Sequence, residues 1–321
     1  MNFGILEPLR ADLLQVERKM RGALDVYSPT LAELLTYVID HGGKRLRPAL
    51  VIIASRFYPV EDFDQVIAGA AAVELLHTAS LVHDDIVDNA LLRRGSPTLN
   101  LHWGGGTTVL IGDYLLARSA SLATHTGNKR LIEKFSDTLV VLVEGELREI
   151  FKDGSIFSRE EYSRRIYAKT ASLFAVSAEA GAMLSAAPEA VVQVLRNYGN
   201  NLGMAFQIVD DVLDFSGKEG VVGKTVGNDL RQNVVTLPLI YWHDAHPADD
   251  RVERILDQDP ERERLLAGLV AEVSRSPAID QAMGDAKRYV EAAKALLAQL
   301  PPHDVKSLMC DLADFVIQRK A

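Results

Sequence analysis

Two clusters of aspartates are the residues whose type and spacing point most directly to chemistry. Each has the spacing Asp-Asp-x-x-Asp and follows an apolar run that is helical in pattern. The clusters are Asp84, Asp85 and Asp88, and Asp210, Asp211 and Asp214. In each, the i and i+4 carboxylates share one helix face, where like charges destabilise a helix by roughly 0.2–0.5 kcal/mol. The spacing therefore predicts that a cation offsets each cluster.

The apolar runs before the clusters indicate which cation this is. A single Asp-Asp-x-x-Asp is usually a solvated helix end, but two copies after apolar segments indicate partly buried carboxylates, which are costly without partners. Hard divalent cations with oxygen ligands are the usual partners, and magnesium combines one or two carboxylates with waters and substrate phosphates. The clusters thus predict two halves of one magnesium site with a phosphate beside it.

Basic residues near the clusters are candidates for binding that phosphate. Segment 42–48, Gly-Gly-Lys-Arg-Leu-Arg-Pro, places cations on a glycine-containing turn entering a helix, where backbone can approach a phosphate. By itself this segment fits an ordinary basic helix start equally well. Arginines that follow the first cluster can bind phosphate oxygens in pairs. The candidates are Lys44, Arg45, Arg47, Arg93, Arg94 and Lys169.

Two further features have a functional and a purely structural interpretation. The glycine-rich segment 216–224 can close over a phosphate through Lys218 and Lys224, or simply connect two helices. His77 lies two helical turns before Asp84 on nearly the same face, so we interpret it as a ligand contact rather than a core histidine.

Helical periodicity sets the elements that must position these residues. Apolar residues recur at i, i+3, i+4 and i+7 almost throughout, which predicts an all-α protein of about a dozen helices. Helix starts are marked by Ser158 with Glu161, by Asp259-Pro260 and by Ser276-Pro277. The predicted helices are 4–23, 31–41, 46–57, 63–90, 107–126, 128–152, 159–186, 189–215, 229–245, 260–275, 278–299 and 303–319.

The long helices 63–90 and 189–215 each end in an aspartate cluster, which predicts a bundle whose two central helices meet at one cavity. A helix C-terminus already carries partial negative charge, so cations are needed there. No linker or low-complexity run divides the chain. We therefore expect a single domain over residues 1–321.

Composition excludes several classes of protein. A net charge of −9 and a pI near 5.4 argue against a nucleic-acid partner, and 48% hydrophobic residues suffice for a core. The single cysteine, Cys310, excludes an intrachain disulfide and fits a reducing cytoplasm. The N-terminus is not typical of a signal peptide, and no run is long and uncharged enough to predict a transmembrane segment.

Taken together, these motifs resemble the trans-type polyprenyl diphosphate synthases, which elongate isoprenyl chains head to tail. Order and spacing match over nearly the whole chain. The matching motifs are Gly42 to Pro48, Asp84 to Asp88, Arg93-Arg94-Gly95, Gly112-Asp113-Tyr114, Gly145-Glu146, Lys169-Thr170, Phe206-Gln207, Asp210 to Asp214, Gly223-Lys224, Asn228-Asp229-Leu230 and Thr236-Leu237-Pro238. The resemblance implies an all-helical fold around a deep central cavity, three magnesium ions per active site, and a homodimer.

The resemblance also implies roles for individual residues. Asp84, Asp88 and Asp210 look like the principal metal ligands, with Asp85, Asp211 and Asp214 in direct or water-mediated support. The allylic diphosphate is expected on Arg93, Lys169 and Lys224, and isopentenyl diphosphate on Lys44, Arg47, His77 and Arg94. Thr170 and Gln207 are expected along the path of the reacting carbons. Asn233 and Val234 stand where the family often has a glycine followed by lysine or another polar residue, so one accessory phosphate contact is expected to be missing. Glu149 stands where many members carry glutamine.

The residues one turn before Asp84 bear on product length. Ala79 and Ser80 are small, whereas family members with short products have aromatic rings there. We therefore expect a medium- or long-chain all-trans product, for instance for a quinone side chain, with Leu75 or Leu76 as a deeper limit; Ala79 would otherwise serve only close helix packing. The alternatives are a short-chain farnesyl or geranylgeranyl diphosphate synthase, a class I terpene cyclase, and a non-catalytic subunit of a heteromeric synthase.

Overall fold

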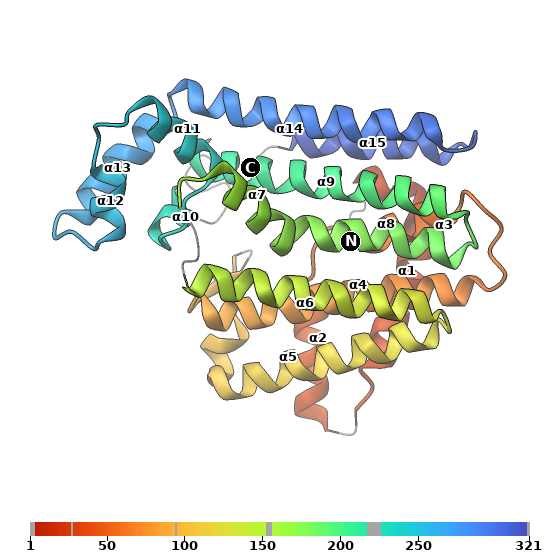
Figure 1. Ribbon diagram of the computed structural model, residues 1–321. Helices are drawn as coiled ribbons and strands as arrows, with labels where there is room; N and C mark the ends of the chain where they lie inside the picture. Colours follow the sequence, from red (N-terminus) through yellow and green to blue (C-terminus); the bar gives the residue numbers. More distant parts are fainter. Residues whose placement is uncertain (1–3, 27, 94, 152–155, 217–225, 320–321) are drawn as a thin grey trace. The chain divides into compact units, whose positions relative to one another are not determined.

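The computed structural model (Figure 1) describes residues 4–26, 28–93, 95–151, 156–216 and 226–319. The chain divides into two compact units. Unit 1 comprises residues 1–140, 172–200 and 294–312, and unit 2 comprises residues 141–171, 201–293 and 313–321. Both are helical, which confirms the predicted all-α fold, whereas the assignment of 1–321 to a single domain stays a prediction.

Unit 1 is built around α4, a helix whose side chains are buried along most of its length. This helix packs most extensively against α5 and also contacts α1, α3 and α8. A run of small residues, Gly69 to Ala72, lets its neighbours approach. The elements within this unit are η1 (Gly4–Leu9), α1 (Arg10–Ala23), α2 (Pro29–Asp40), α3 (Leu46–Ser55), α4 (Phe63–Val87), β1 (Leu92–Arg93), β2 (Ser96–Pro97), α5 (Leu99–His125), α8 (Ser172–Leu184) and η3 (Leu297–Gln299).

Close helix contact in unit 1 depends on a glycine between α3 and α8. A Cβ on Gly181 would lie 2.1 Å from the carbonyl oxygen of Val51, so only glycine fits this crossing. Among the described residues, α4 alone has the length and composition of a membrane-spanning helix, but 78% of its apolar window is buried inside the protein. That burial is typical of a core helix.

Unit 2 carries shorter helices, and four long helices share their residues with unit 1. The elements within unit 2 are α7 (Arg159–Ile166), η2 (Tyr167–Ala171, a π-helix), α10 (Asn228–Arg231), α11 (Leu237–Ala245), α12 (Arg251–Leu256) and α13 (Arg262–Val273). The shared helices are α6 (Lys129–Phe151), α9 (Glu189–Ser216), α14 (Pro277–Leu296) and α15 (Val305–Gln318).

Several predicted boundaries are wrong for identifiable reasons. The predicted helix 159–186 is interrupted by the π-turn of η2, and 229–245 is broken into α10 and α11, with Pro238 in the first turn of α11. Helix α5 begins eight residues before the predicted start at 107 and kinks at Gly104, whose φ is +76°. The short helix α12 was not predicted.

The predicted capping signals have mixed outcomes. Ser158 accepts a hydrogen bond from the Glu161 amide at 3.3 Å, and α14 starts at Pro277 as predicted. Asp259 does not cap α13, because that helix begins at Arg262, and Asp259 instead accepts from the Glu261 amide at 2.7 Å.

Candidate active site

The first aspartate cluster lies at the C-terminal end of α4, as predicted. Asp84 is half-buried and Asp88 is exposed at the residue that caps the helix. Asp85 differs, because only 6% of its surface is exposed and its Oδ1 accepts a hydrogen bond from Arg93 Nε at 2.7 Å. Arg93 lies in β1, which pairs with β2 in an antiparallel arrangement, and its side chain reaches back to Asp85 on α4. Asp84 and Asp88 are therefore the members of this cluster most accessible to a ligand.

A cavity of about 70 Å³ in unit 1 adjoins this cluster. The predicted substrate residues His77 and Arg93 line it together with Asp85 and the Gly42–Gly43 turn. These residues come from α4, the β1 strand and the segment before α3. The structure thus brings together a basic group, an imidazole, a carboxylate and a glycine turn that the sequence places up to about fifty residues apart.

The three cations of segment 42–48, which runs into the first turn of α3, have two kinds of surroundings. Lys44 is exposed, and Arg47 is half-buried with its guanidinium 4.6 Å from the centre of the Phe174 ring. Arg45 is only 3% exposed and points inward. Its guanidinium donates to Glu74 at 2.8 Å, to Glu17 at 3.3 Å and to the Ile39 carbonyl at 2.9 Å.

The interpretation of Arg45 as a phosphate-binding residue is therefore wrong. Its backbone is left-handed, with φ of +57°, which turns the side chain away from the face used by its neighbours. A Cβ on Gly42 would lie 2.2 Å from Arg45 Nη1, so glycine is needed where this guanidinium passes beneath the turn. Arg45 is a structural ion-pair residue that anchors the segment.

The second aspartate cluster lies near the end of α9, and its three members have different surroundings. Asp210 is half-buried and forms an ion pair with Arg319 at 2.8 Å. Asp214 accepts hydrogen bonds from the amides of Asn228 and Asp229 at 3.1 and 3.2 Å, so it holds the start of α10. Because Asp214 accepts from these amides, Asp210 is the half-buried member not used to hold α10, and its role as a metal ligand stays a prediction.

Asp211 is 3% exposed and lies inside unit 2. Its Oδ2 accepts a hydrogen bond from the Tyr162 hydroxyl at 2.7 Å, and its Oδ1 accepts one from Gln207 Nε2 at 2.8 Å. Burial raises the pKa of the Asp211 carboxyl to about 7, although both hydrogen bonds act in the opposite direction. Burial and the nearby carboxylate raise the pKa of Tyr162 well above its usual value, so the phenol keeps its proton and donates.

The predicted pair Lys169 and Thr170 lies in the π-turn η2. A π-turn adds a residue to the helix, and such turns are common at functional sites. Lys169 is exposed and its Nζ lies 3.0 Å from Glu146 Oε1, whereas Thr170 is buried and its hydroxyl donates to Gln207 Oε1 at 2.7 Å. Thr170 and Gln207 are thus in contact, as their predicted shared role requires.

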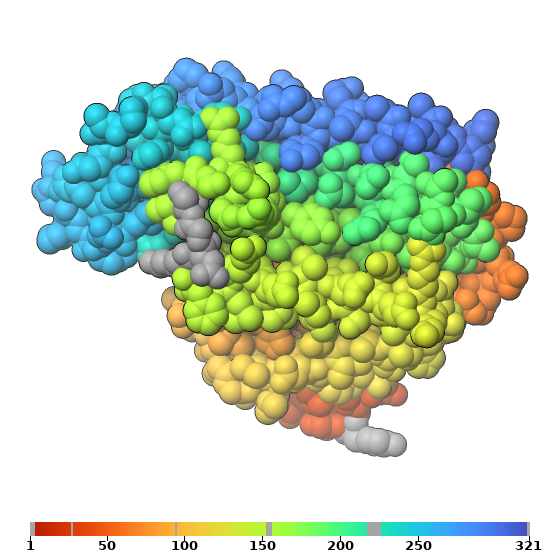
Figure 2. All heavy atoms as spheres, in the orientation of Figure 1, coloured from red at the N-terminus to blue at the C-terminus, as the bar shows by residue number. Residues whose placement is uncertain are grey.

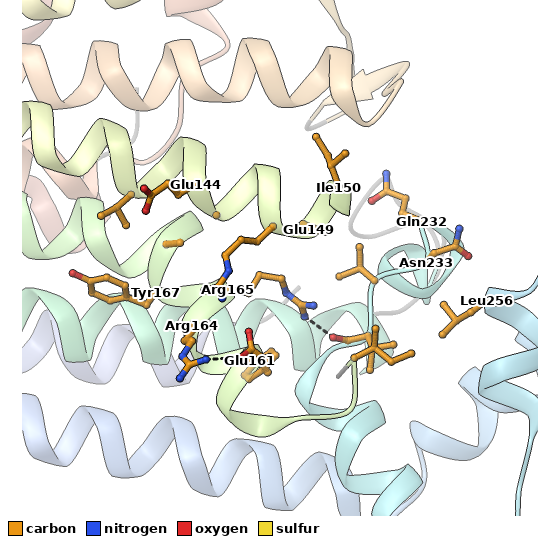
Figure 3. Close-up of a pocket in the computed structure, with 18 of the residues that line it drawn as sticks. Glu144, Glu149, Ile150, Glu161, Arg164, Arg165, Tyr167, Gln232, Asn233 and Leu256 are labelled. Atoms are coloured by element: carbon orange, nitrogen blue, oxygen red, sulfur yellow. Dashed lines mark hydrogen bonds and ion pairs between the residues drawn. The ribbon is translucent and has the colours of Figure 1, made fainter. Parts of the chain in front are cut away.

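Unit 2 also contains a larger cavity of about 680 Å³ (Figure 3). The side chains around it come from α6, α7, η2, α12 and the segment after α10. They include the charged residues Glu144, Glu149, Arg164 and Arg165. Asn233 and Val234, where the sequence departs from the family, also line it, and Asn233 has a left-handed φ of +63°. All three departures therefore adjoin one cavity, away from the first aspartate cluster in sequence.

The carboxylates of the two clusters fit a magnesium ion that also binds water and phosphate. Within the part of the chain that the structure describes, no three His, Cys, Asp or Glu side chains gather closely enough to hold a metal by themselves. Magnesium usually takes one or two carboxylates and completes its shell with water and substrate phosphate. Asp84 with Asp88, and Asp210, are hard oxygen donors that fit this mode of binding.

Some predicted residues lie outside the described residues, and others lie at tightly packed positions. Arg94, Lys218 and Lys224, with nearly all of the glycine-rich segment 216–224, lie outside the described residues. Ala79 is 1% exposed, and Ser80 is half-buried with its hydroxyl donating to the His77 carbonyl at 2.9 Å. The proposed effect of these two small residues on product length stays a prediction.

The sequence interpretation missed two residues at the second cluster. Tyr162 and Arg319 contact Asp211 and Asp210, but they lie roughly 50 and 110 residues from them in the chain. The Arg319 guanidinium also stacks 4.0 Å from the centre of the Phe206 ring. An isolated tyrosine or arginine carries no spacing signal, so only tertiary structure reveals these contacts.

Comparisons with known proteins find a matching family and similar proteins. A family model described as polyprenyl synthetase matches residues 28–273. Heptaprenyl diphosphate synthase component 2 of Geobacillus stearothermophilus is 39% identical over 317 residues, 97% of each chain. Octaprenyl diphosphate synthase of Haemophilus influenzae is 33% identical over 311 residues, 96% of this chain and 94% of that protein.

A solved structure is similar over the same length. The crystal structure of a polyprenyl synthase from Caulobacter crescentus CB15, complexed with calcium and isoprenyl diphosphate, has a TM-score of 0.92 and 35% identity. The match covers 99% of this chain and 97% of that chain.

Proposed function

Because this chain belongs to the polyprenyl synthetase family, we propose that it condenses isopentenyl diphosphate head to tail onto an allylic diphosphate. The product is a medium- or long-chain all-trans polyprenyl diphosphate. The observation that carries this proposal is the cavity of unit 1, where the Gly42–Gly43 turn, His77 and Arg93 gather beside Asp85. Basic groups next to an aspartate cluster suit a diphosphate whose charge is shared between cations and metal ions.

Magnesium is the proposed metal, with three ions per active site as the family resemblance implies. Asp84, Asp88 and Asp210 would hold it, with Asp85, Asp211 and Asp214 in support. Bound magnesium would supply Lewis-acid stabilisation of the negative charge that develops on the leaving diphosphate oxygens.

The side chains of this protein have binding and shielding roles in the reaction. Arg93, Lys169 and Lys224 would hold the allylic diphosphate, and Lys44, Arg47, His77 and Arg94 would hold isopentenyl diphosphate. The allylic C–O bond breaks to give a carbocation and diphosphate. The isopentenyl double bond then attacks this cation to form the new C–C bond, and a proton leaves to the released diphosphate. No side-chain base is required, and exclusion of water protects the cation.

A diphosphate-release assay on the purified chain tests this function. With magnesium present, release is expected only when an allylic diphosphate and isopentenyl diphosphate are supplied together, and chelation of the metal is expected to abolish it. Release from the allylic substrate alone would instead identify a class I terpene cyclase. The second aspartate cluster and the isopentenyl-type basic set argue against that alternative.

Substitution of Ala79 tests the proposed product length. We expect Ala79→Tyr to shorten the product to farnesyl or geranylgeranyl length, because a ring there would block the growing chain one turn before Asp84. Ala79 is buried, so overpacking is expected to cost roughly 1–3 kcal/mol of stability. Ser80→Phe therefore serves as a second variant at a half-buried position, and Ser80→Ala as the control. Chromatography that shows unchanged product length in both enlarged variants would contradict the proposal.

We propose that the protein is a cytoplasmic homodimer, and exposed apolar faces of α5 and α6 support self-association. Both helices present side chains at the surface in Figure 2. On α6, residues Val140, Val143, Leu147 and Ile150 recur at helical spacing and are 43–53% exposed. On α5, Trp103 and Leu110 are 40% and 69% exposed. Apolar stripes of this kind usually mark contact surfaces.

Leu147→Glu is expected to shift the protein from dimer to monomer in sedimentation velocity, because a charge would be buried at the contact. Leu14→Glu is the matched control, since Leu14 on α1 is 42% exposed and Leu147 is 43% exposed. A Leu147→Glu protein that sediments like the wild type would contradict a contact on this face.

A heteromeric assembly is the remaining alternative. The Geobacillus relative is named as component 2 of its synthase. The activity of this chain alone is therefore the measurement that distinguishes a complete enzyme from one subunit of a heteromeric enzyme. A non-catalytic subunit would be expected to lose the aspartates, whereas this chain keeps all six.

A further inference from the structure

Four side chains in unit 2 form a continuous series of hydrogen bonds that ends at two proposed reaction-path residues. Tyr162 donates to Asp211 at 2.7 Å, Gln207 donates to Asp211 at 2.8 Å, and Thr170 donates to Gln207 at 2.7 Å. The residues come from α7, the π-turn η2 and α9. Tyr162, Asp211 and Thr170 are buried, and Gln207 is half-buried.

The two hydrogen bonds of Gln207, one donated and one accepted, fix the orientation of its side-chain amide. The amide nitrogen of Gln207 points toward Asp211 and donates to its Oδ1 at 2.8 Å. The amide oxygen of Gln207 then faces Thr170 and receives its hydroxyl hydrogen. The Thr170 and Gln207 oxygens each keep a further lone pair beyond this hydrogen bond, and oxygen lone pairs favour a neighbouring carbocation.

Tyr162 is the group that holds the carboxylate in this position. Its hydroxyl engages Oδ2 of Asp211 and leaves Oδ1 for Gln207. Without the hydroxyl, a buried oxygen would lose its donor, and such a loss costs roughly 1–3 kcal/mol. We expect the carboxylate to rotate toward another donor in that case, which would release Gln207.

We propose that Tyr162 is a positioning residue for chain elongation, which acts through Asp211 to fix the orientation of Gln207 and Thr170. This inference rests on the proposed function for its kinetic consequence, but its geometry stands independently. Tyr162 makes none of the proposed contacts with either diphosphate, so its effect should fall on kcat. The Michaelis constant for isopentenyl diphosphate, whose proposed partners Lys44, Arg47 and His77 belong to unit 1, should not change.

Tyr162→Phe tests the proposal, and Tyr198→Phe is its matched control. Tyr198 is likewise buried, and its hydroxyl makes a 2.7 Å hydrogen bond to the Met309 carbonyl in unit 1. We expect Tyr162→Phe to lower kcat roughly 10–100-fold, the usual effect of removing a partner that orients a functional group. Tyr198→Phe should stay within about twofold of the wild type, as expected for a lost hydrogen bond remote from the site.

A double-mutant cycle separates positioning from a general effect on the fold. In the Thr170→Val background the far end of the series is already absent, so Tyr162→Phe is expected to cost less than about threefold. Equal fold-changes in both backgrounds, or a single-mutant kcat within about twofold of the wild type, would overturn the proposal.

A crystal structure of the Tyr162→Phe protein gives a readout that needs no turnover. The Gln207 amide is expected to rotate so that its contact with Thr170 is broken. Unchanged Thr170–Gln207 and Gln207–Asp211 distances, near the present 2.7 and 2.8 Å, would overturn the inference whatever the activity. If the wild type fails to condense the two diphosphates, the proposed function is wrong, and the crystal structure still decides whether Tyr162 fixes Gln207.

Discussion

Replacing Asp84 by asparagine is expected to lower kcat for chain elongation by roughly 10²–10³-fold. The magnesium ion that would stabilise the charge developing on the leaving diphosphate would lose a charged oxygen ligand. Asn has nearly the shape of Asp, and Asp84 is half-buried at the end of α4, so the fold should persist. Steady-state kinetics over a range of magnesium concentrations measures the effect. More magnesium should be needed for half-maximal rate in the variant.

Asp64→Asn provides the control for this substitution. Asp64 lies in the first turn of the same helix, is 68% exposed and pairs with Lys19 at 2.5 Å. Loss of an exposed ion pair is worth little, so activity and stability should match the wild type. A kcat within about threefold of the wild type for Asp84→Asn would rule out a principal metal ligand at this position, since the loss of such a group costs far more.

Arg45→Met is expected to cause the largest loss of stability, about 3–5 kcal/mol in the free energy of unfolding, because two buried carboxylates would lose their cation. The side chains of Glu17 and Glu74 are 10% and 4% exposed, so water cannot easily replace the guanidinium. Chemical denaturation monitored by circular dichroism measures the change.

Arg56→Met is the matched control for Arg45→Met. Arg56 also pairs with an acid on α1, Asp12, at 2.5 Å, but its side chain is 35% exposed. Its loss should therefore cost roughly 1 kcal/mol or less. Adding Glu17→Gln and Glu74→Gln to Arg45→Met is expected to recover part of the lost stability, because the unpaired charges are then removed. Equal losses in the two single variants would contradict the buried ion-pair account.

The sequence was sufficient to predict the helical class and the two helices that carry the aspartates. Spacing within one helix is local, so α4 and α9 with their terminal clusters follow directly from periodicity. His77, Arg93 and Asp85 were predicted as residues of three different groups, and their gathering around the unit 1 cavity depends on the pairing of β1 with β2.

Other features of the site depend on tertiary contacts that no local pattern reports. The apolar periodicity predicts one continuous helix across the π-turn at Lys169 and Thr170, because a single added residue hardly changes an apolar pattern. Arg45 looks like its basic neighbours in sequence, and only its left-handed backbone turns it inward. Asp85 and Asp211 look equivalent to the other aspartates until burial distinguishes them.

Incorporation of labelled isopentenyl diphosphate by the purified wild-type chain, with magnesium and an allylic diphosphate, tests the central claim most directly. Chromatography of the dephosphorylated products is expected to show all-trans chains longer than geranylgeraniol, with one diphosphate released for each isopentenyl unit added. Label that remains entirely in isopentenyl diphosphate while the allylic substrate is consumed, or while neither substrate is consumed, would contradict it.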